Sequence, residues 1–429
     1  MTGRAALSLL LAFAASGCVF HEVREQQQDI DAYCLVSGTL AAANELQGPF
    51  VVTLARASTA AGSPAWQGID HFVLEGAGRW GFVAPAGAYR IAAFEDVNRD
   101  FRYQEGEPFV APESSAAVTC PVGGRFMDLA VRMPERQAGR LDASLDLSTL
   151  TPRDSVSQVN ATLGQLTEAG RIATLADPRF SDDVARSGQW RPFDFLMEGY
   201  AGIYFLGPHD PRKTPVLFVH GINGTPASFS YLIDHLDRSR FEPWIYYYPS
   251  GAHLGALAAH LDQTVAKLQL RYGVKQVAIV AHSMGGLVAR GFVQRRAREG
   301  RAGEIPVFIT ISTPWGGHGA AELAMKTAPA VVRVWEDMAP GSEYLRGLYA
   351  TVSSKEPPHH LLFTFERKST SFGPSDDQGV TVASQLAPSA QKHATRLYGF
   401  DDSHMSVLRD PEAAALINRL LDPPADPAR

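Results

Sequence analysis

The chain has 429 residues, and a length prior of roughly 150 residues per domain suggests two or three domains. Hydrophobic residues make up 45% of the chain and charged residues 20%, which is the composition of an ordinary globular protein. The formal net charge of −6 excludes the basic balance of nucleic-acid-binding proteins, so no nucleic-acid partner is expected.

The first 18 residues have the pattern of an export signal. Arg4 precedes an apolar run, Ala5 to Ala15, that is too short to remain in a bilayer as a spanning helix. The last four residues, Ala-Ser-Gly-Cys, resemble the lipobox of bacterial lipoproteins, in which the cysteine is acylated and becomes the mature N-terminus. This resemblance implies a signal peptide over residues 1–17 and a membrane anchor on Cys18 in the cell envelope. A plain signal peptide cleaved nearby is the alternative.

Residues 18–32 are mostly polar and are expected to form a short tether above the membrane. Between residues 33 and 140 the pattern changes to short β-prone runs separated by Gly, Pro and Asn, which predicts an all-β sandwich. The segment G-R-W-G-F-V-A-P-A-G-A-Y-R-I resembles the Ig-like or prealbumin-like modules of secreted proteins. The predicted strands are Leu35 to Thr39, Phe50 to Arg56, His71 to Leu74, Trp80 to Val83, Tyr89 to Asp96, Ala116 to Thr119 and Arg125 to Val131.

Two of the three cysteines, Cys34 and Cys120, remain once Cys18 is assigned to the anchor. An exported protein meets an oxidising compartment, so they are expected to form one disulfide. They fall in the first and penultimate strands of the sandwich. Two separate buried thiols are the alternative.

One loop of the sandwich is rich in oxygen-bearing side chains. Asp96, Asn98, Asp100 and Glu107 stand at positions 1, 3, 5 and 12 of a loop like that of an EF-hand, a density of oxygen ligands that suits calcium. Phe101 occupies the position of the EF-hand glycine, and a hairpin whose Asp and Asn residues favour the turn is an equally good interpretation.

Strands and helices alternate in the second domain, residues 150–429, which predicts a parallel sheet covered on both faces. Residues 141–147 could close the sandwich or open this domain. The predicted strands are Val216 to Val219, Trp244 to Tyr248, Val277 to Val280, Val307 to Ile311, Leu361 to Phe365 and Arg396 to Tyr398. The predicted helices are Phe229 to Leu236, Leu254 to Leu270, Met284 to Arg298 and Pro411 to Leu421.

The segment from Gln276 to Phe292 reads as strand, sharp turn and helix, with Ser283 at the apex. The turn A-H-S-M-G-G matches the nucleophile elbow G-x-S-x-G of α/β hydrolases, with Ala281 in place of the first glycine. Small residues are needed there because the strand and helix backbones pass close together. The A-H-S-M-G-G form resembles several bacterial lipases.

A serine hydroxyl needs a base and oxyanion donors before it can act as a nucleophile. The apolar strand before H-G-I-N-G resembles the early strand of α/β hydrolases, whose following loop gives one oxyanion N–H; the residue after the nucleophile gives the other. Carried to this chain, the resemblance implies the backbone N–H groups of Ile222 and Met284. A mere strand-to-loop turn is the alternative at the first position.

The acid and the base should follow the serine in chain order. The segment D-D-Q-G-V-T-V-A-S-Q resembles the lipase segment that carries the aspartate, and counting back from S-Q gives Asp377, with Asp376 as the competitor. His404 lies in a loop between the last predicted strand and the last helix, and this order makes it the base. His282 adjoins the serine and is interpreted as structural.

Residues 200–421 therefore resemble a bacterial lipase or esterase of the α/β-hydrolase superfamily. The resemblance also covers S-T-P-W-G-G at residues 312–317, which is expected to line the pocket, and residues 320–349, which are mostly helical and could form a cap. It implies a Ser-His-Asp serine hydrolase that acts on carboxylic esters or lipids and requires no cofactor. An acyltransferase or thioesterase with the same triad, or an inactive surface binding module, are the alternatives.

Overall fold

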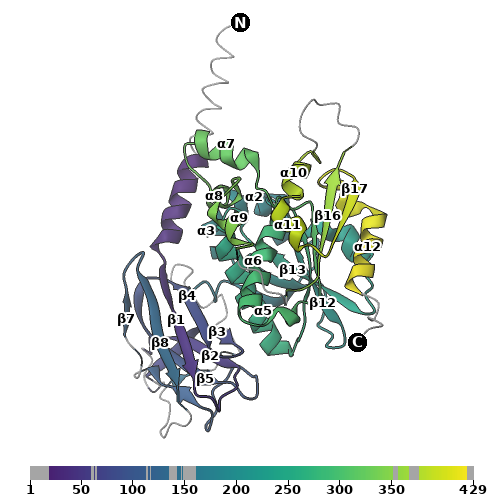
Figure 1. The fold of residues 1–429 in the computed structure, drawn as a ribbon. Helices are drawn as coiled ribbons and strands as arrows, with labels where there is room; N and C mark the ends of the chain where they lie inside the picture. The colour runs from purple at the N-terminus through teal and green to yellow at the C-terminus, as the bar shows by residue number, and fades with distance from the viewer. Residues whose placement is uncertain are drawn as a thin grey trace.

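The computed structural model describes residues 19–58, 62, 65–112, 115, 117–134, 143–145, 147, 161–350, 356–366 and 376–422. Two domains and an N-terminal helix make up this part of the chain (Figure 1). The predicted signal peptide and Cys18 lie outside the described residues.

The N-terminal helix covers residues 19–32, where the sequence predicts a polar tether. It packs on the second domain: Val23 and Gln26 are buried, and the Gln27 amide donates a 2.6 Å hydrogen bond to the Val331 carbonyl. In Figure 1 the helix runs from the sandwich up the side of the second domain. The segment therefore differs from the predicted tether, because these contacts fix it to the protein.

The first domain contains two packed β-sheets, as predicted. One sheet has the strand order β4-β1-β8 and the other β6-β5-β2-β3-β9, with β7 paired to β5. Buried residues alternate along β1 because every second side chain points into the space between the sheets. The strands are β1 (Cys34–Ala42), β2 (Phe50–Ala57), β3 (Trp66–Leu74), β4 (Gly78–Ala84), β5 (Gly87–Glu95), β6 (Phe109–Val110), β7 (Val118–Cys120), β8 (Arg125–Met133) and β9 (Ala143–Ser144).

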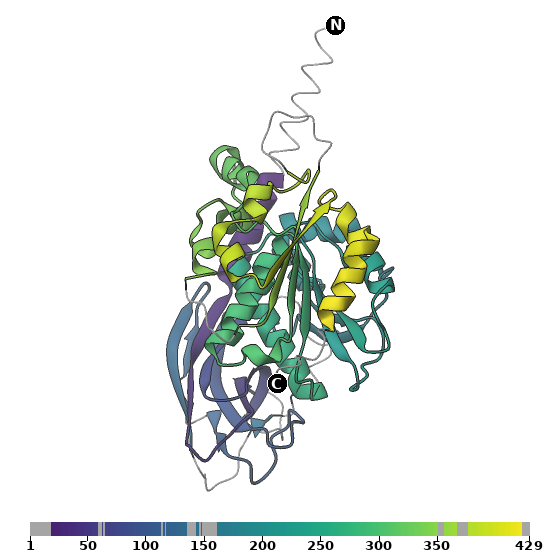
Figure 2. The same cartoon turned by 45° about the vertical axis from the view of Figure 1, so that its right-hand side comes forward.

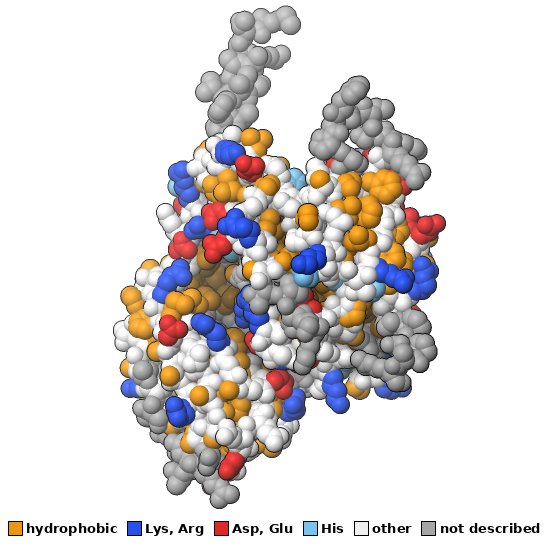
Figure 3. Space-filling model, viewed as in Figure 1, with side chains coloured by type: hydrophobic (Ala, Val, Ile, Leu, Met, Phe, Trp, Pro, Cys, Tyr) orange, Lys and Arg blue, Asp and Glu red, His pale blue; other side chains and the backbone are white. Residues whose placement is uncertain are grey.

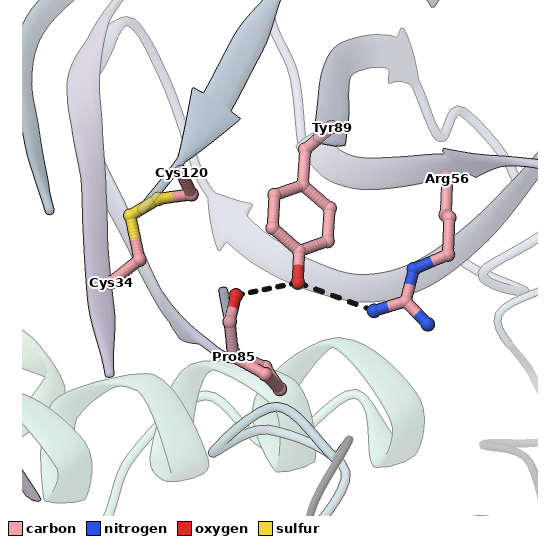
Figure 4. The surroundings of a disulfide bond; sticks show 5 residues. All are labelled: Cys34, Arg56, Pro85, Tyr89 and Cys120. Carbon is pink, nitrogen blue, oxygen red and sulfur yellow. Dashed lines mark hydrogen bonds between the residues drawn. A yellow bond between two sulfur atoms is a disulfide. The ribbon is translucent and has the colours of Figure 1, made fainter. Parts of the chain in front are cut away.

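The predicted disulfide is present between Cys34, at the start of β1, and Cys120, at the end of β7. It joins the two sheets across a Cα–Cα distance of 6.0 Å (Figure 4). Nearby, the Tyr89 hydroxyl donates a 2.7 Å hydrogen bond to the Pro85 carbonyl and accepts one from Arg56 at 3.2 Å. The disulfide therefore lies at a buried end of the sandwich, where the nearby Tyr89 hydroxyl has hydrogen-bond partners.

The sandwich extends beyond the predicted boundary at residue 140. Strand β9 pairs in parallel with β3, and Leu145 and Leu147 are buried in a cluster with Val51 and Phe94 of the sandwich. Of the two interpretations of residues 141–147, the described part of this segment closes the sandwich.

The second domain is built on one eight-stranded sheet with the order β10-β11-β13-β12-β14-β15-β16-β17. Every neighbouring pair is parallel except β11 and β13. The strands are β10 (Glu168–Ile172), β11 (Gly202–Phe205), β12 (Thr214–Val219), β13 (Phe241–Tyr247), β14 (Ala278–His282), β15 (Phe308–Ile311), β16 (His359–Phe365) and β17 (Arg396–Asp401).

Helices cover both faces of this sheet, as Figure 2 shows. Leu217 and Ile279 face the helices α5 and α6, whereas the alternate residues Phe218 and Val280 face α4 and α12. The helices are α2 (Asp182–Trp190), α3 (Pro192–Met197), α4 (Ser230–Asp234), α5 (Leu254–Tyr272), α6 (Met284–Arg298), α7 (Gly319–Thr327), α8 (Arg333–Met338), α9 (Glu343–Gly347), α10 (Val382–Gln385), α11 (Pro388–His393) and α12 (Pro411–Leu421). Among the described residues, no helix combines the length and apolarity needed to cross a membrane.

Candidate active site

Ser283 occupies the turn between β14 and α6 in a strained backbone conformation, with φ 54° and ψ −131°. Such a conformation costs a non-glycine residue about 1–3 kcal/mol and persists only where the surroundings enforce it. The surroundings here are tight: a Cβ at Gly285 would lie 2.3 Å from the Val219 carbonyl oxygen, and one at Gly286 would lie 2.0 Å from the Thr313 hydroxyl. The glycines therefore let α6 pass close enough to its neighbours to hold the turn.

The three predicted triad residues meet at one edge of the sheet. Ser283 follows β14, Asp377 follows β16 and His404 follows β17, and the carboxyl ends of these parallel strands lie at the upper edge in Figure 1. His404 Nε2 lies 2.9 Å from Ser283 Oγ, and His404 Nδ1 lies 2.8 Å from Asp377 Oδ2. The structure thus brings together groups that are 121 and 27 residues apart in the sequence.

Asp377 is buried with zero exposure and accepts hydrogen bonds on both oxygens. The N–H groups of Gly379 (3.0 Å) and Val380 (2.6 Å) donate to Oδ1, and the Thr364 hydroxyl (2.5 Å) and the Gln385 amide (3.1 Å) donate to Oδ2. Burial alone would raise the pKa of Asp377, but the hydrogen bonds and the neighbouring His404 outweigh it and lower the pKa below its usual value. The group is accordingly a carboxylate at neutral pH.

The ionised carboxylate determines which tautomer of His404 is present. An ionised carboxylate can accept hydrogen bonds but cannot donate them, so His404 Nδ1 carries the proton. His404 Nε2 then presents its lone pair to the Ser283 hydroxyl. This tautomer can take a proton from the serine. Asp376, the competitor for the acid, instead accepts the Gln378 N–H at 3.1 Å.

His282 holds the loop that carries His404. Its Nε2 lies 2.9 Å from the His404 carbonyl, and the two rings lie 4.7 Å apart. A carbonyl only accepts, so Nε2 is the donor. Burial, followed by the nearby His404, lowers the pKa of His282 to about 3 and keeps the ring neutral. Beyond the structural role predicted for it, His282 therefore anchors the backbone of His404.

The two predicted oxyanion donors lie beside the serine. A Cβ at Gly221, the residue before Ile222, would lie 2.8 Å from the Ser283 Cβ, so the loop after β12 passes directly against the serine. Within the described part of the chain, neither the Ile222 N–H nor the Met284 N–H donates a hydrogen bond. Met284 opens α6, where a helix has no internal acceptor for its first N–H groups. Both amides are therefore free to bind a ligand oxygen.

Three supporting residues were not assigned these roles from the sequence. Thr364 and Gln385 donate to Asp377, and His318 Nε2 lies 2.7 Å from the Gly379 carbonyl in the same loop. In the sequence, Gln385 is only part of the S-Q pair from which the position of Asp377 is counted. Thr364 is the second-last residue of a predicted strand that precedes the acid, and this position is its only signal in the sequence.

The oxygen-rich loop of the sandwich uses its side chains internally. Asp96 accepts the N–H groups of Asp100 and Phe101, both at 3.0 Å, and Glu107 accepts those of Val97 (3.0 Å) and Gln104 (2.9 Å). Among the residues that the structure describes, no group of three or more His, Cys, Asp or Glu side chains is arranged to hold a metal. These hydrogen bonds hold the turn together.

The order of the sheet, its one antiparallel pair and the serine turn define the α/β-hydrolase fold. A family model described as alpha/beta hydrolase fold matches residues 214–325, which include Ile222, Ser283 and Met284. No curated protein matches the chain.

Solved structures with a related fold cover about half of the chain. The mature lipase BlEst2 of Bacillus licheniformis is 17% identical, with a TM-score of 0.41 over 51% of this chain and 97% of that one. The lin2722 product of Listeria innocua is 16% identical, with a TM-score of 0.39 over 50% and 96%. Lipase B of Aspergillus fumigatus is 15% identical, with a TM-score of 0.39 over 51% and 56%. At these identities the likeness is one of fold.

Proposed function

We propose that the second domain is a serine hydrolase that cleaves carboxylic esters, including esters of lipids. The observation that carries this proposal is the pair of hydrogen bonds linking Ser283 Oγ to His404 and His404 to Asp377, at 2.9 and 2.8 Å. A buried carboxylate, an imidazole in the acceptor tautomer and a serine on a strained turn are the groups that acyl transfer needs.

In the proposed mechanism, Ser283 Oγ attacks the ester carbonyl carbon and its proton passes to His404 Nε2. The oxyanion that forms accepts the N–H groups of Ile222 and Met284, each worth about 3 kcal/mol of transition-state stabilisation. Asp377 stabilises the imidazolium, which then protonates the departing alcohol. His404 then deprotonates a water molecule, which attacks the acyl-enzyme carbonyl. The imidazolium returns this proton to Ser283 Oγ as the carboxylic acid leaves.

The test is hydrolysis of p-nitrophenyl esters by the Ser283→Ala variant. We expect kcat/KM to fall by at least about 10³-fold, because the nucleophile is lost, while far-ultraviolet circular dichroism is unchanged. Ser239→Ala, at an exposed serine on a remote turn, is the matched control and should be fully active. Retained activity in Ser283→Ala would refute the assignment. Product analysis with an added alcohol or a thioester in the same assay separates hydrolysis from transfer and from thioesterase activity.

We also propose that the protein is exported and anchored to a membrane of the cell envelope through acylated Cys18. The support is the lipobox-like sequence of residues 15–18, together with a disulfide of the kind found in oxidising compartments. Cys18→Ala should move the protein from the membrane fraction to the soluble fraction of expressing cells and abolish labelling by a radioactive fatty acid. Unchanged membrane attachment of this variant would contradict the anchor.

A further inference from the structure

Helix α7 packs on the rest of the protein through few side chains. Of its nine residues only Ala321 is buried, and Leu323 is 61% exposed. At 3.6 residues per turn, Leu323 lies on the side of the helix opposite to Ala321. The two charged residues of the helix, Glu322 and Lys326, form an ion pair at 2.6 Å. The outer face of α7 therefore has an apolar centre and no unpaired charge.

Helix α7 connects the catalytic edge of the sheet with the N-terminal helix. At its start, His318 Nε2 donates a 2.7 Å hydrogen bond to the carbonyl of Gly379, in the loop that carries the proposed acid. Beyond its end, the carbonyl of Pro329 accepts a 2.6 Å hydrogen bond from Arg24 of the N-terminal helix. Figures 1 and 2 show α7 beside the start of the N-terminal helix, at the upper end of the described part of the molecule. Figure 3 shows apolar side chains at this end.

The contacts of the N-terminal helix determine where a lipid anchor on Cys18 would lie. Phe20 packs edge-on against Trp190, at the end of α2, with ring centroids 6.4 Å apart. Cys18 precedes Phe20 by two positions, and two residues span at most about 7 Å. An acylated Cys18 therefore leaves no length of free chain between the bilayer and this end of the protein.

We propose that α7 lies in the membrane interface with Leu323 inserted among the lipid chains, so that the catalytic edge of the second domain faces the lipid. The proposal rests on the acylated Cys18 of the proposed function for the position of the membrane, and on the exposed face of α7 for the contact. A weak contact is sufficient, because the anchor raises the effective concentration of lipid at α7. Met405, which follows His404 and is 52% exposed, is at the same edge and faces the same surface.

Two single-cysteine variants locate the membrane on the protein. Leu323→Cys places a thiol on α7, and Ile172→Cys replaces an apolar residue of similar exposure, 56%, at the end of β10. Because β10 and β11 run antiparallel to the central strands, Ile172 lies at the edge of the sheet opposite to Ser283. The native cysteines are occupied by the proposed anchor and the disulfide, so each variant has one free thiol.

Each variant, acylated and labelled with nitrobenzoxadiazole, is reconstituted into vesicles of phosphatidylethanolamine and phosphatidylglycerol with brominated chains. We expect the label at residue 323 to shift its emission to shorter wavelength and to be quenched by bromine, and the label at residue 172 to show neither effect. Equal emission at the two positions, or failure of the native protein to stay with the vesicles, would overturn the proposal. Neither outcome bears on ester hydrolysis, because the measurement does not use the activity.

A charged variant tests the consequence for the proposed function. Leu323→Asp should lower hydrolysis of a long-chain diacylglycerol in the same vesicles at least about fivefold, because burial of a leucine side chain changes a binding equilibrium by about an order of magnitude. Ile172→Asp is the matched control and should leave this rate unchanged. Both variants should hydrolyse p-nitrophenyl acetate in solution at the native rate, which also shows that they fold. Equal diacylglycerol hydrolysis by the two variants would refute the docking of α7, whereas a native protein inactive on p-nitrophenyl acetate would refute the proposed function.

Discussion

His404 is positioned by three separate hydrogen bonds that act on different parts of the residue. Its ring donates to the Asp377 carboxylate, its backbone N–H donates to the Asp377 carbonyl at 2.7 Å, and its own carbonyl accepts from His282. The first bond fixes the tautomer, and the other two fix the loop. A base held this firmly keeps its Nε2 within reach of Ser283 at little entropic cost during the reaction.

We predict that His282→Ala lowers kcat roughly tenfold to hundredfold with a smaller effect on KM, because His404 loses an anchor and misplacement of a reacting group is costly. His282→Gln, which keeps an amide donor, should recover part of the rate. His359→Ala is a matched control, since His359 is also buried but bonds Thr310 away from the serine. An equal loss of kcat in His282→Ala and His359→Ala would mean that His282 acts only through stability.

The sequence allowed the three groups of the candidate site to be named, because their order along the chain and the turn around Ser283 are local patterns. The contacts that support them are not local. Thr364 and Gln385 lie 13 and 8 residues from Asp377 and reach it only because β16 and α10 pack together. Nothing in the spacing of these residues indicates that packing.

At the scale of elements, strands β12 to β17 were predictable, whereas β10 and β11 at one edge of the sheet were not. Strands β12 to β15 are mostly apolar and almost wholly buried, which is typical of strands covered on both faces. Strand β10 is polar, half exposed and interrupted by Gly170 at φ 84°, so it shows neither an apolar run nor alternation. Helix α2 was also missed, although Ser181 caps it and two aspartates occupy its first turn.

The contribution of the disulfide to the free energy of unfolding can be tested directly. It closes a loop with a sequence separation of 86, which in the loop-entropy model stabilises the fold by about 4–5 kcal/mol. We predict that the Cys34→Ala, Cys120→Ala double variant loses about 2–5 kcal/mol of unfolding free energy in urea titrations. Because Ser283 lies in the other domain, hydrolysis by the folded variant should be unaffected. An unchanged unfolding midpoint would show that the bond does not contribute to stability.

The whole molecule is a sandwich and a hydrolase domain joined over a broad contact. The Leu163 N–H donates to the Val83 carbonyl at the sandwich edge (3.0 Å), and Ala266 and Leu270 of α5 share an apolar cluster with Phe94. The N-terminal helix braces the second domain from the side. A recess of about 890 Å³ lies at this contact, which sequence patterns of either domain alone cannot reveal.

Buried neutral histidines in both domains predict loss of stability in mild acid. Burial lowers the pKa of these histidines, so below about pH 6.5 the unfolded chain binds protons that the folded chain does not. The unfolding free energy therefore decreases as the pH is lowered. We expect a decline from about pH 6.5 to 4, at most about 1.4 kcal/mol per histidine per pH unit, in urea titrations. The decline should be shallower for His359→Gln; constant stability across this range would contradict the prediction. The residues are His71, His220, His260, His282 and His359.

Labelling by a fluorophosphonate probe, followed by peptide mass spectrometry to find the modified residue, directly tests whether Ser283 is an activated nucleophile. Such probes form a covalent adduct only with a serine that a neighbouring base activates. We predict one adduct per chain, on Ser283, and loss of the adduct in His404→Ala although the serine is still present. Absence of any adduct on the native protein, or an adduct on a different serine, would contradict the assignment of Ser283, His404 and Asp377 as the catalytic groups.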